Sequence, residues 1–507
     1  MSKGKLLALC VVWLMVAGIA AVAWRYVIVG GKEQAKQSEQ EAILNQTKGT
    51  SQYDIDLKFG IDQFSGYAIL RSPEFRKRLQ REKIEVSFVD DRADYTKRLR
   101  NLQTGSINMA VFTIDALIKA SATIGDTPAV VVSIIDETRG ADAIVANQAS
   151  VPNVEALNHP DTRFILTPDS PSETLARVVM NDFSLDQLAD NPFVMTSDPE
   201  DTLARYRKSQ PNSRDVFVLW EPYVSKVLEN PEMHVVIDSS RFRGRIVDVI
   251  VTSRDFLAKN RAVVEDVVGS YFAAAYSYRD QMQTLVRNDA KQQQAPLTDA
   301  QAKKLTAGIR WKNTQENFAH FGLRTDNNLQ HIEDMISNIT DVLIQTGGIQ
   351  IDPTENRPNQ LYYERVLSNL KDSNFHPGLS SEKISDDQIL LPALSETAWS
   401  KLREVGELNV RQLVFPRGSS RLTETSCTVL DDLVNTLNSW PQYYLLVRGN
   451  ASMRGDFEAN KRLAANRAEA AVDYLVQQGI DKNRIKARGG DPTGSTSVSF
   501  VLGEAPY

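Results

Sequence analysis

Hydrophobic and polar positions follow recognisable periods from about residue 53 onward. Residues Ile55 to Phe59 and Ile84 to Val89 alternate between apolar and polar side chains, which predicts two strands. Between them, Ser72 followed by Pro73 is typical of a helix start, because serine caps free amides and proline fits the first helical turn. A strand, a helix and a strand in this order predict a parallel α/β sheet.

The same kind of pattern continues and then starts again in a second unit. A helix, a buried strand and another helix capped by Thr113 are predicted at residues 95–102, 108–112 and from 113 onward. Further strands are predicted at residues 143–146, 163–166 and 215–219. Two α/β lobes are therefore expected, followed by mostly helical residues up to about Leu370.

The pattern at the C-terminal end predicts a separate small domain. His376 to Ser395 is rich in Pro, Ser and Asp without strong periodicity, which is typical of a linker. We divide the chain into a membrane anchor, a linker, a two-lobed domain, a second linker and a C-terminal α/β domain. These are residues 1–30, 31–52, 53–376, 377–397 and 398–507.

The N-terminus has the features of a transmembrane anchor. An uncharged run from Leu6 to Trp24 follows Lys3 and Lys5, and a bilayer-spanning helix takes roughly 17 to 25 residues. The positive charge before the run predicts a single-pass inner-membrane protein with the bulk of the chain in the periplasm. Cleavage after the export signal is the alternative, because Ala21 to Ala23 resembles a signal-peptidase site.

Composition excludes several classes of function. The 507 residues carry a net charge of −6 from interspersed charges of both signs, which gives no basic footprint for nucleic acid. The only cysteines are Cys10, inside the apolar N-terminal run, and Cys427, in the C-terminal part, so neither a disulfide framework nor a cysteine metal site can be built. No GxSxG or HExxH motif is present, so we predict no catalytic residue, no metal and no cofactor.

Four segments in the two-lobed region resemble the periplasmic solute-binding proteins of the nitrate/taurine type, the substrate-binding components of ABC transporters. The segments are Phe59 to Tyr67, Arg98 to Gly105 followed by Ala110 to Thr113, Asp136 to Asp142, and Leu219 to Pro222. The resemblance implies two lobes of the type II kind that close on a small ligand by hinge motion. We expect the crossovers between the lobes near residues 137–143 and within 220–254.

The resemblance also implies that helix N-termini in the cleft hold the ligand. Such ends offer unpaired amides and a partial positive charge for an anion. Candidate residues at these positions are Ser65, Gly66, Tyr67, Thr113, Ser170 and Ser172. For Ser170 the alternative is a capping box with Glu173, which would satisfy the same amides internally.

Three further candidates indicate ligands of opposite charge. Arg139, at the expected lobe crossover, would pair with an anion, or else be a solvated hinge residue. Trp220 and Glu221 would suit a cation or amine, with Glu221 capping the next helix as the alternative. The identity of the ligand therefore stays open. Some relatives are pyrimidine-synthesising enzymes, but their cysteine-rich motif has no counterpart in these lobes.

Residues from about Ala398 to Leu502 resemble the OmpA-like peptidoglycan-binding domain. Leu413 to Phe415 is expected as a strand, and a helix follows with Leu430, Leu433 and Leu437 on one face. The motif positions are Gly449, Asn450, Ala451, Ser452, Gly455, Asn460, Leu463, Arg467 and Ala468.

In that family an aspartate and an arginine hold the zwitterionic diaminopimelate of the wall peptide. Arg467 matches the arginine, and Asn460 lies two helical turns earlier, so both can face one pocket. Ser452 stands where the family has its aspartate, with Asp456 as a substitute only if its loop turns inward. We therefore expect weak peptidoglycan binding, or an OmpA-like fold that serves for docking.

These observations predict a membrane-anchored periplasmic protein that binds a small ligand, in a transport- or sensing-linked role, with a module that faces the cell wall. The alternative is a non-catalytic scaffold of an envelope protein complex in which both modules are degenerate. The expected partners are a small molecule, peptidoglycan, the inner membrane and such a complex, and no nucleic acid.

Overall fold

The computed structural model describes residues 53–505, apart from 211, 222, 326–328, 374, 385–388, 390, 452–453 and 493–496. The predicted anchor at residues 1–30 and the predicted linker at 31–52 lie outside this part. Among the described residues, no helix has both the length and the apolar character needed to cross a bilayer.

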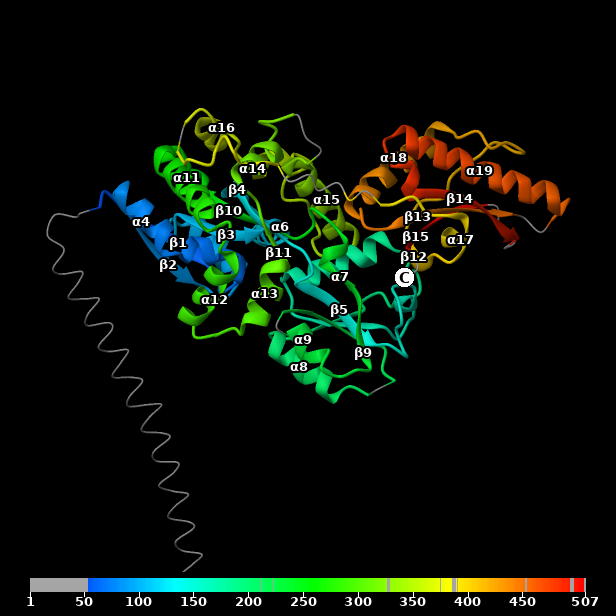
Figure 1. Ribbon diagram of the computed structural model, residues 1–507, viewed down its shortest axis with the longest axis horizontal. Helices are drawn as coiled ribbons and strands as arrows, with labels where there is room; N and C mark the ends of the chain where they lie inside the picture. The colour runs from blue at the N-terminus through cyan, green and yellow to red at the C-terminus, as the bar shows by residue number, and fades with distance from the viewer. Residues whose placement is uncertain are drawn as a thin grey trace, which may run out of the picture. The chain divides into compact units, whose positions relative to one another are not determined.

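A mixed six-stranded sheet forms the centre of the first lobe (Figure 1). Its order is β11-β4-β10-β3-β1-β2, with β1 Ile55–Ile61, β2 Ile84–Asp90, β3 Met109–Thr113, β4 Ala129–Thr138, β10 Val247–Ser253 and β11 Ile309–Trp311. β1 and β3 run parallel. The expectation of a wholly parallel sheet is wrong, because β10 enters between β3 and β4 and is antiparallel to both.

Helices cover this sheet, and three of them, α4, α5 and α6, begin at or beside the residues that the sequence indicates. They are α3 Ala68–Arg71, α4 Pro73–Arg81, α5 Tyr95–Gln103, α6 Ile114–Ile124, α10 Arg254–Lys259, α11 Arg261–Tyr278, α12 Met282–Gln292, α13 Asp299–Ala307, α14 Thr314–His320 and α16 Arg365–Lys371. The predicted start of α4 is confirmed, since the Ser72 hydroxyl accepts a hydrogen bond from the Phe75 amide at 3.2 Å. The helix buries Phe75 and Leu79, one turn apart, against the lobe.

The second lobe contains a five-stranded sheet in the order β7-β6-β8-β5-β9. Its strands are β5 Asp142–Asn147, β6 Arg163–Leu166, β7 Phe193–Met195, β8 Asp215–Trp220 and β9 Met233–Asp238, with helices α7 Pro171–Asp182, α8 Pro199–Lys208 and α9 Tyr223–Val227. The three strands predicted here are confirmed as β5, β6 and β8. The two-lobed α/β architecture follows from these two separate sheets.

Two segments connect the lobes. Residues 139–141 lead from β4 to β5, and residues 239–246 lead from β9 back to β10. The first lies where the sequence predicts it. The second occupies only the end of the predicted range 220–254, because α9 and β9 still belong to the second lobe.

One long helix packs against both lobes. α15 Ile332–Gln345 contacts α6 of the first lobe and α7 of the second. The residue that follows α15, Thr346, accepts a hydrogen bond at its carbonyl from the Arg177 guanidinium of α7 at 2.6 Å. α15 therefore bridges the lobes beside the cleft.

The C-terminal domain is a four-stranded sheet with one short and two long helices. The sheet order is β12-β15-β13-β14, with β12 Arg403–Glu407, β13 Tyr444–Ala451, β14 Ile485–Pro492 and β15 Ser497–Glu504, and the helices are α17 Glu396–Ser400, α18 Glu424–Ser439 and α19 Phe457–Gln477. The predicted apolar face of α18 is confirmed, since Leu430, Leu433 and Leu437 are buried. A Cβ on Gly449 would collide with the Ala464 carbonyl, so glycine allows α19 to approach β13 closely.

The predicted strand at Leu413 to Phe415 is wrong. These residues have no strand assignment, and the backbone of Val414 bonds to a side chain instead: its N–H donates to the Ser426 hydroxyl, and its carbonyl accepts from the same hydroxyl, both at 2.8 Å. The edge strand beside β15 in this sheet is β12, which pairs antiparallel with β15.

The C-terminal domain and the second lobe share one hydrophobic core. A single cluster of buried residues contains Phe164 and Phe183 from the lobe together with Trp440 and Leu445 from the domain. The indole of fully buried Trp440 contacts the rings of Phe183 and Phe242 edge to face, with centroids 5.3 and 5.4 Å apart. Its Nε1 donates a hydrogen bond to the Asp182 carboxylate at 2.8 Å.

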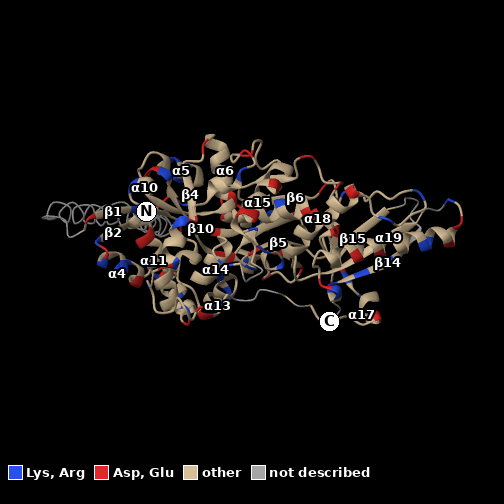
Figure 2. Ribbon diagram, turned by 90° about the horizontal axis from the view of Figure 1, so that it is seen from above, with Lys and Arg blue, Asp and Glu red and all other residues tan. Residues whose placement is uncertain are grey.

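Backbone contacts reinforce this junction. The Arg243 amide donates to the Ser439 carbonyl at 2.8 Å, and the Ser184 amide donates to the Glu407 carbonyl at 2.9 Å. An ion pair joins Arg241 to Glu504 at 2.9 Å. Both arginines lie in or beside the crossover 239–246, so the C-terminal domain directly contacts one of the two connections between the lobes. Figure 2 shows that basic and acidic residues are interspersed over the ribbon, as the sequence predicts.

Candidate functional site

A row of polar side chains crosses the first-lobe sheet near the end from which the chain leaves for the second lobe. Thr113 on β3 lies opposite Asp248 on β10, and Asp248 lies opposite Asp136 on β4. Asp136 in turn lies opposite Trp311 on β11. Directly opposed residues share one face of a sheet, so the four side chains form a continuous row.

The predicted turn Ser65–Tyr67 lies against this row. The Tyr67 hydroxyl donates a short hydrogen bond to Asp248, and the Trp311 indole donates to the Gly66 carbonyl at 2.8 Å. A Cβ on Gly66 would collide with the Asp136 carboxylate, so this position requires glycine. The structure therefore brings together Ser65, Gly66, Tyr67 and Thr113, as the sequence predicts.

The two carboxyl groups of the row are buried beside one another. Asp136 is 0% exposed and Asp248 is 2% exposed. Burial raises the pKa of both groups, because removal from water disfavours the charged form, and the repulsion between them raises the pKa of Asp248 further. Apart from the carboxyl of Asp248, no described group acts as a hydrogen-bond partner for the Asp136 oxygens.

The N-terminus of α6 carries a carboxylate of its own. Thr113 occupies the predicted N-cap position of α6, but its hydroxyl makes no hydrogen bond to the amides of the first turn. Asp115 lies in the first turn and accepts a short hydrogen bond from the Thr174 hydroxyl of the second lobe. Its other oxygen and the Thr113 hydroxyl are both buried without a partner in good hydrogen-bond geometry in the described part of the chain.

Ser170 caps α7, which confirms the internal alternative for this residue. Its hydroxyl accepts from the Glu173 amide at 3.4 Å and donates to the Thr167 carbonyl at 2.7 Å. The capping box itself is not formed, because the Glu173 carboxylate accepts from the Asp169 amide at 2.7 Å instead of the Ser170 amide. Ser170 is therefore engaged within its own turn.

Ser172, in the first turn of α7, is held by a buried carboxylate. Its hydroxyl donates to Asp142 at 3.0 Å, and Asp142 lies at the start of β5 with 3% exposure. Burial raises the pKa of Asp142 to about 7, and the charge of Asp115 adds to the rise while the Ser172 hydroxyl opposes it. Trp220 lies directly opposite Asp142 on β8.

The lobes are in direct contact at this point. Lys119 of α6 forms ion pairs with Glu173 at 2.8 Å and with Asp169 at 2.5 Å, both in the second lobe. The contact between Thr174 and Asp115 lies one helical turn away. The structure is thus a closed arrangement in which the two helix N-termini face each other.

Arg139 has the position of a hinge residue. Its guanidinium pairs with Glu137 at 3.2 Å, and Glu137 also accepts from the Gly244 amide at 2.7 Å and pairs with Lys312 at 2.9 Å. Glu137 therefore joins both crossovers and the residue after β11. Lys312 and Arg139 hold the pKa of this buried carboxyl below its usual range despite desolvation.

The Glu221 carboxylate binds side-chain and backbone groups of the protein itself. It accepts from the Ser225 amide at 3.2 Å and from the Ser225 hydroxyl at 3.1 Å, and it forms a short ion pair with Lys304. This confirms the alternative in which Glu221 caps the next helix. Trp220 remains half-buried with its ring edge to face against Tyr223.

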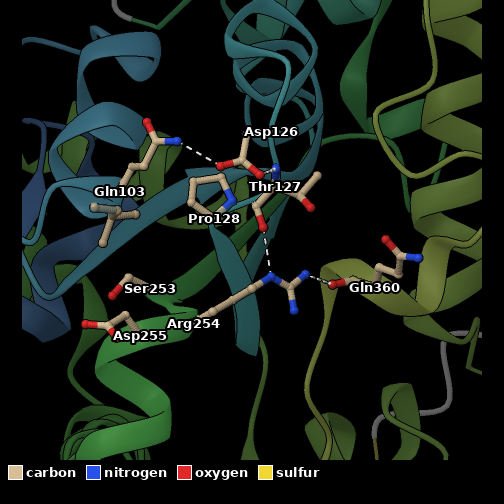
Figure 3. A pocket seen from close by; sticks show the side chains of 9 residues that line it. Gln103, Asp126, Thr127, Pro128, Ser253, Arg254, Asp255 and Gln360 are labelled. Atoms are coloured by element: carbon tan, nitrogen blue, oxygen red, sulfur yellow. Dashed lines mark hydrogen bonds between the residues drawn. The ribbon is translucent and has the colours of Figure 1, made fainter.

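Two surface cavities lie away from these residues. One, of about 460 Å³, is lined in the first lobe by Gln103, Asp126, Thr127, Ser253, Arg254 and Gln360 among others (Figure 3). There Arg254 donates to the Thr127 carbonyl at 2.8 Å, and Gln103 donates to Asp126 at 2.8 Å. The other, of about 430 Å³, lies in the second lobe around Arg163 and Asp215. Neither is lined by a predicted ligand-binding residue.

The candidate peptidoglycan residues have separate contacts. The Arg467 guanidinium donates to the Ser419 carbonyl at 2.9 Å and lies over the Phe415 ring at 4.8 Å. Asn460 donates to the Arg454 carbonyl at 2.8 Å. Asp456 accepts from the Ala459 amide as the N-cap of α19. Ser452 lies outside the described residues.

The buried aspartates Asp115, Asp136, Asp142 and Asp248 were not among the predicted site residues. Asp136 and Asp142 fall inside a segment that the resemblance uses, but each looks like an ordinary polar residue at a strand end. Their hydrogen-bond partners lie between 30 and 181 residues away in sequence. The usable signal was a charged residue inside an otherwise apolar strand, as in Val247–Ser253.

Residues 414–496 match the OmpA family model. A 75-residue stretch, 15% of the chain, is 37% identical to the peptidoglycan-associated lipoprotein of Mesorhizobium japonicum and 33% identical to that of Rhizobium meliloti. The chain spans 45% and 43% of those two relatives, which is less than half of their length. The resemblance of the C-terminal domain to the OmpA family is confirmed.

Similar solved structures include two periplasmic solute-binding proteins. The aliphatic sulphonate binding protein SsuA from Escherichia coli has 18% identity and a TM-score of 0.46, covering 62% of this chain and 99% of that one. The nitrate-binding protein NrtA from Synechocystis has 12% identity and a TM-score of 0.45, covering 62% and 87%.

Proposed function

We propose that the protein is a membrane-anchored periplasmic binding protein whose lobes close on a small ligand while its OmpA-like domain faces the cell wall. The observation that carries the proposal is the pair of facing helix N-termini, α6 and α7, in lobes joined by two crossovers. Polar groups from both lobes meet there, as a site that forms on closure requires. The uncharged run in residues 6–24 supports the anchor.

Ligand occupancy tests this proposal. Native mass spectrometry of the detergent-extracted full chain should find a co-purified small molecule, and its removal should lower the thermal midpoint. Small-angle scattering should show expansion of the empty protein and compaction when the ligand returns. A protein that carries no small molecule and gives the same scattering curve in every extract would contradict ligand binding.

Attachment to peptidoglycan is the second part of the proposal, and the OmpA family match supports it. The ordinary recognition pair is incomplete, because Ser452 stands at the aspartate position and Arg467 donates to backbone within its own domain. A lost charge-assisted contact is worth about 1.5–3 kcal/mol, or roughly one to two powers of ten in affinity. We therefore expect weak binding.

A co-sedimentation series with diaminopimelate-containing peptidoglycan tests the wall contact. Ser452→Asp should strengthen binding by restoring a partner for the ammonium group of the wall peptide, and Arg467→Ala should remove that gain. Arg462→Ala, an exposed arginine on the same helix, is the matched control. Tight binding by the natural chain that ignores Arg467→Ala would place the wall contact elsewhere.

The shared core favours a second candidate, a scaffold of an envelope complex. Phe242 and Arg243, in the crossover between the lobes, contact Trp440 and Ser439 of the C-terminal domain. A hinge held in this way restricts lobe motion, which suits a rigid scaffold better than a receptor. Pull-down of the same envelope proteins by wild type and by a cleft variant, Ser172→Ala, would support the scaffold, whereas loss of partners with that variant would oppose it.

A further inference from the structure

We infer that the cleft between the lobes takes an organic cation, an ammonium or amidinium, and excludes free anions. This inference rests on the proposed function, since it names the ligand class of the same cleft.

The positions at which an anion would bind already carry carboxylates of the protein. Asp115 lies within the first turn of α6, and Asp142 accepts the Ser172 hydroxyl at the first turn of α7 at 3.0 Å. Both side chains are at least 97% buried. When these carboxyls are ionised, an incoming sulfonate or nitrate would meet two negative groups, and like charges about 4 Å apart cost about 4 kcal/mol at a protein surface. The partial positive charge of a helix end does not offset this repulsion.

The same region contains carboxyl groups with few well-aligned donors. Besides Thr174, the Asp115 carboxyl has only poorly aligned contacts with the Thr113 hydroxyl and with its own amide, and Asp136, deeper in the first lobe, has only the neighbouring carboxyl of Asp248. Buried acceptors are nearly always paired in folded proteins. A ligand with several N–H groups supplies the missing donors, whereas an anion supplies only further acceptors.

Nearby cationic side chains already have other partners. Lys119 pairs with Glu173 and Asp169, Lys312 pairs with Glu137, and Lys304 pairs with Glu221. Within the described residues, no ion pair includes any of the four buried aspartates, Asp115, Asp136, Asp142 or Asp248. Lys119 and Lys312 act on Asp115 and Asp136 only through space, so a cationic ligand would supply these carboxyls with a direct ionic partner.

Trp220 adds a surface suited to a cation. It lies opposite Asp142 across the strand pair and is half-buried at the end of β8. An aromatic ring next to a carboxylate attracts ammonium groups through its π face. The lobes must separate for entry, since Thr174 now donates to Asp115. On closure the ligand replaces the Thr174 and Ser172 hydroxyls as the donor to these two carboxylates.

Matched probes on the detergent-solubilised full chain test the inference by calorimetry and thermal shift. The cations are butylammonium, benzylammonium and agmatine, and the anions are butanesulfonate, benzenesulfonate and nitrate. At least one cation should bind and raise the midpoint, while the anions should not. Asp115→Asn and Asp142→Asn should each weaken cation binding at least tenfold. Asp126→Asn, an exposed carboxylate just after the other end of α6, should bind like wild type.

A second variant keeps the test decisive if either Asn variant fails to fold. Trp220→Leu should weaken benzylammonium more than butylammonium, because only the aromatic cation gains from ring contact. Binding of an anion, or cation binding that ignores Asp115→Asn, Asp142→Asn and Trp220→Leu, would overturn the inference and leave the proposed function standing. Failure of all six probes in a protein that also carries no co-purified small molecule would overturn both.

Discussion

Replacing Trp440 by alanine should uncouple the second lobe from the C-terminal domain. The indole is fully buried between Phe183 of the lobe and Phe242 of the crossover, and it donates to Asp182. Removing a large buried aromatic side chain costs about 3–5 kcal/mol, from lost burial and the cavity left behind. Asp182, 4% exposed, also loses a donor, which costs about 1–3 kcal/mol for a buried acceptor.

Calorimetric unfolding of the full chain measures this effect. In wild type the second lobe and the C-terminal domain should unfold in one transition, because they share a core. Trp440→Ala should lower that transition and split it in two. Hydrogen exchange should rise at the end of α7 and in the crossover 239–246, where the contacts to Ser439 and Trp440 are lost.

Trp399→Ala is the matched control. Trp399 is also a nearly buried tryptophan of the C-terminal domain, 8% exposed, but its ring packs on Tyr444 of the same domain. This variant should destabilise the C-terminal domain without raising exchange in the crossover. If Trp440→Ala and Trp399→Ala gave the same exchange pattern, or if Trp440→Ala left the crossover protected, the proposed coupling would be refuted.

Three further outcomes follow from single contacts. Asp142→Asn should flatten the dependence of the free energy of unfolding on pH between pH 4 and 8. In the wild type the folded pKa of about 7 exceeds the ordinary 3.8, so the free energy of unfolding falls as pH rises through this window, by at most about 4 kcal/mol. Urea denaturation at several pH values would measure this fall. Gly66→Ala should cost roughly 1–3 kcal/mol in thermal unfolding because its methyl group would collide with Asp136, whereas Ser65→Ala should be nearly neutral; equal effects would exclude the collision. Arg467→Ala should lower the free energy of unfolding of the transition that includes the C-terminal domain by about 1–3 kcal/mol, as urea denaturation would measure, through loss of the Ser419 contact. An effect no larger than that of Arg462→Ala would show that Arg467 is not structural.

Local patterns predicted most of the individual elements. The strands β1, β6 and β8 and the start of α4 at Ser72 follow from alternation and capping, which depend on neighbours within a few residues. The place of β10 between β3 and β4 could not be predicted in this way, because its partners are more than a hundred residues away in sequence. Alternation alone also misassigned Leu413 to Phe415, where Ser426 takes the backbone groups that a neighbouring strand would have bonded.

The sequence predicted the positions of several residues of the candidate site, but not the charged groups that surround them. Gly66, Thr113 and Ser172 were recognised as helix-start positions, and the structure places them at the facing ends of the two lobes. The carboxylates that decide the electrostatics were missed. Asp115 meets Thr174 only where the two lobes come together, and Asp142 meets Ser172 of the same lobe only after 30 intervening positions, so no local pattern reports either contact.

The buried carboxylates also connect the two candidate functions. Charged and close together, Asp115 and Asp142 would repel each other and favour separated lobes, and burial accordingly raises the pKa of both. A proton on either carboxyl removes that repulsion and favours the closed contact between Thr174 and Asp115. The C-terminal domain acts on the same equilibrium from the other side, because it holds the crossover 239–246 through Phe242 and Arg243. Closure of the lobes must therefore either move the C-terminal domain together with the crossover or break contacts between them. The free energy of closure thus depends on how strongly the C-terminal domain is bound to the crossover.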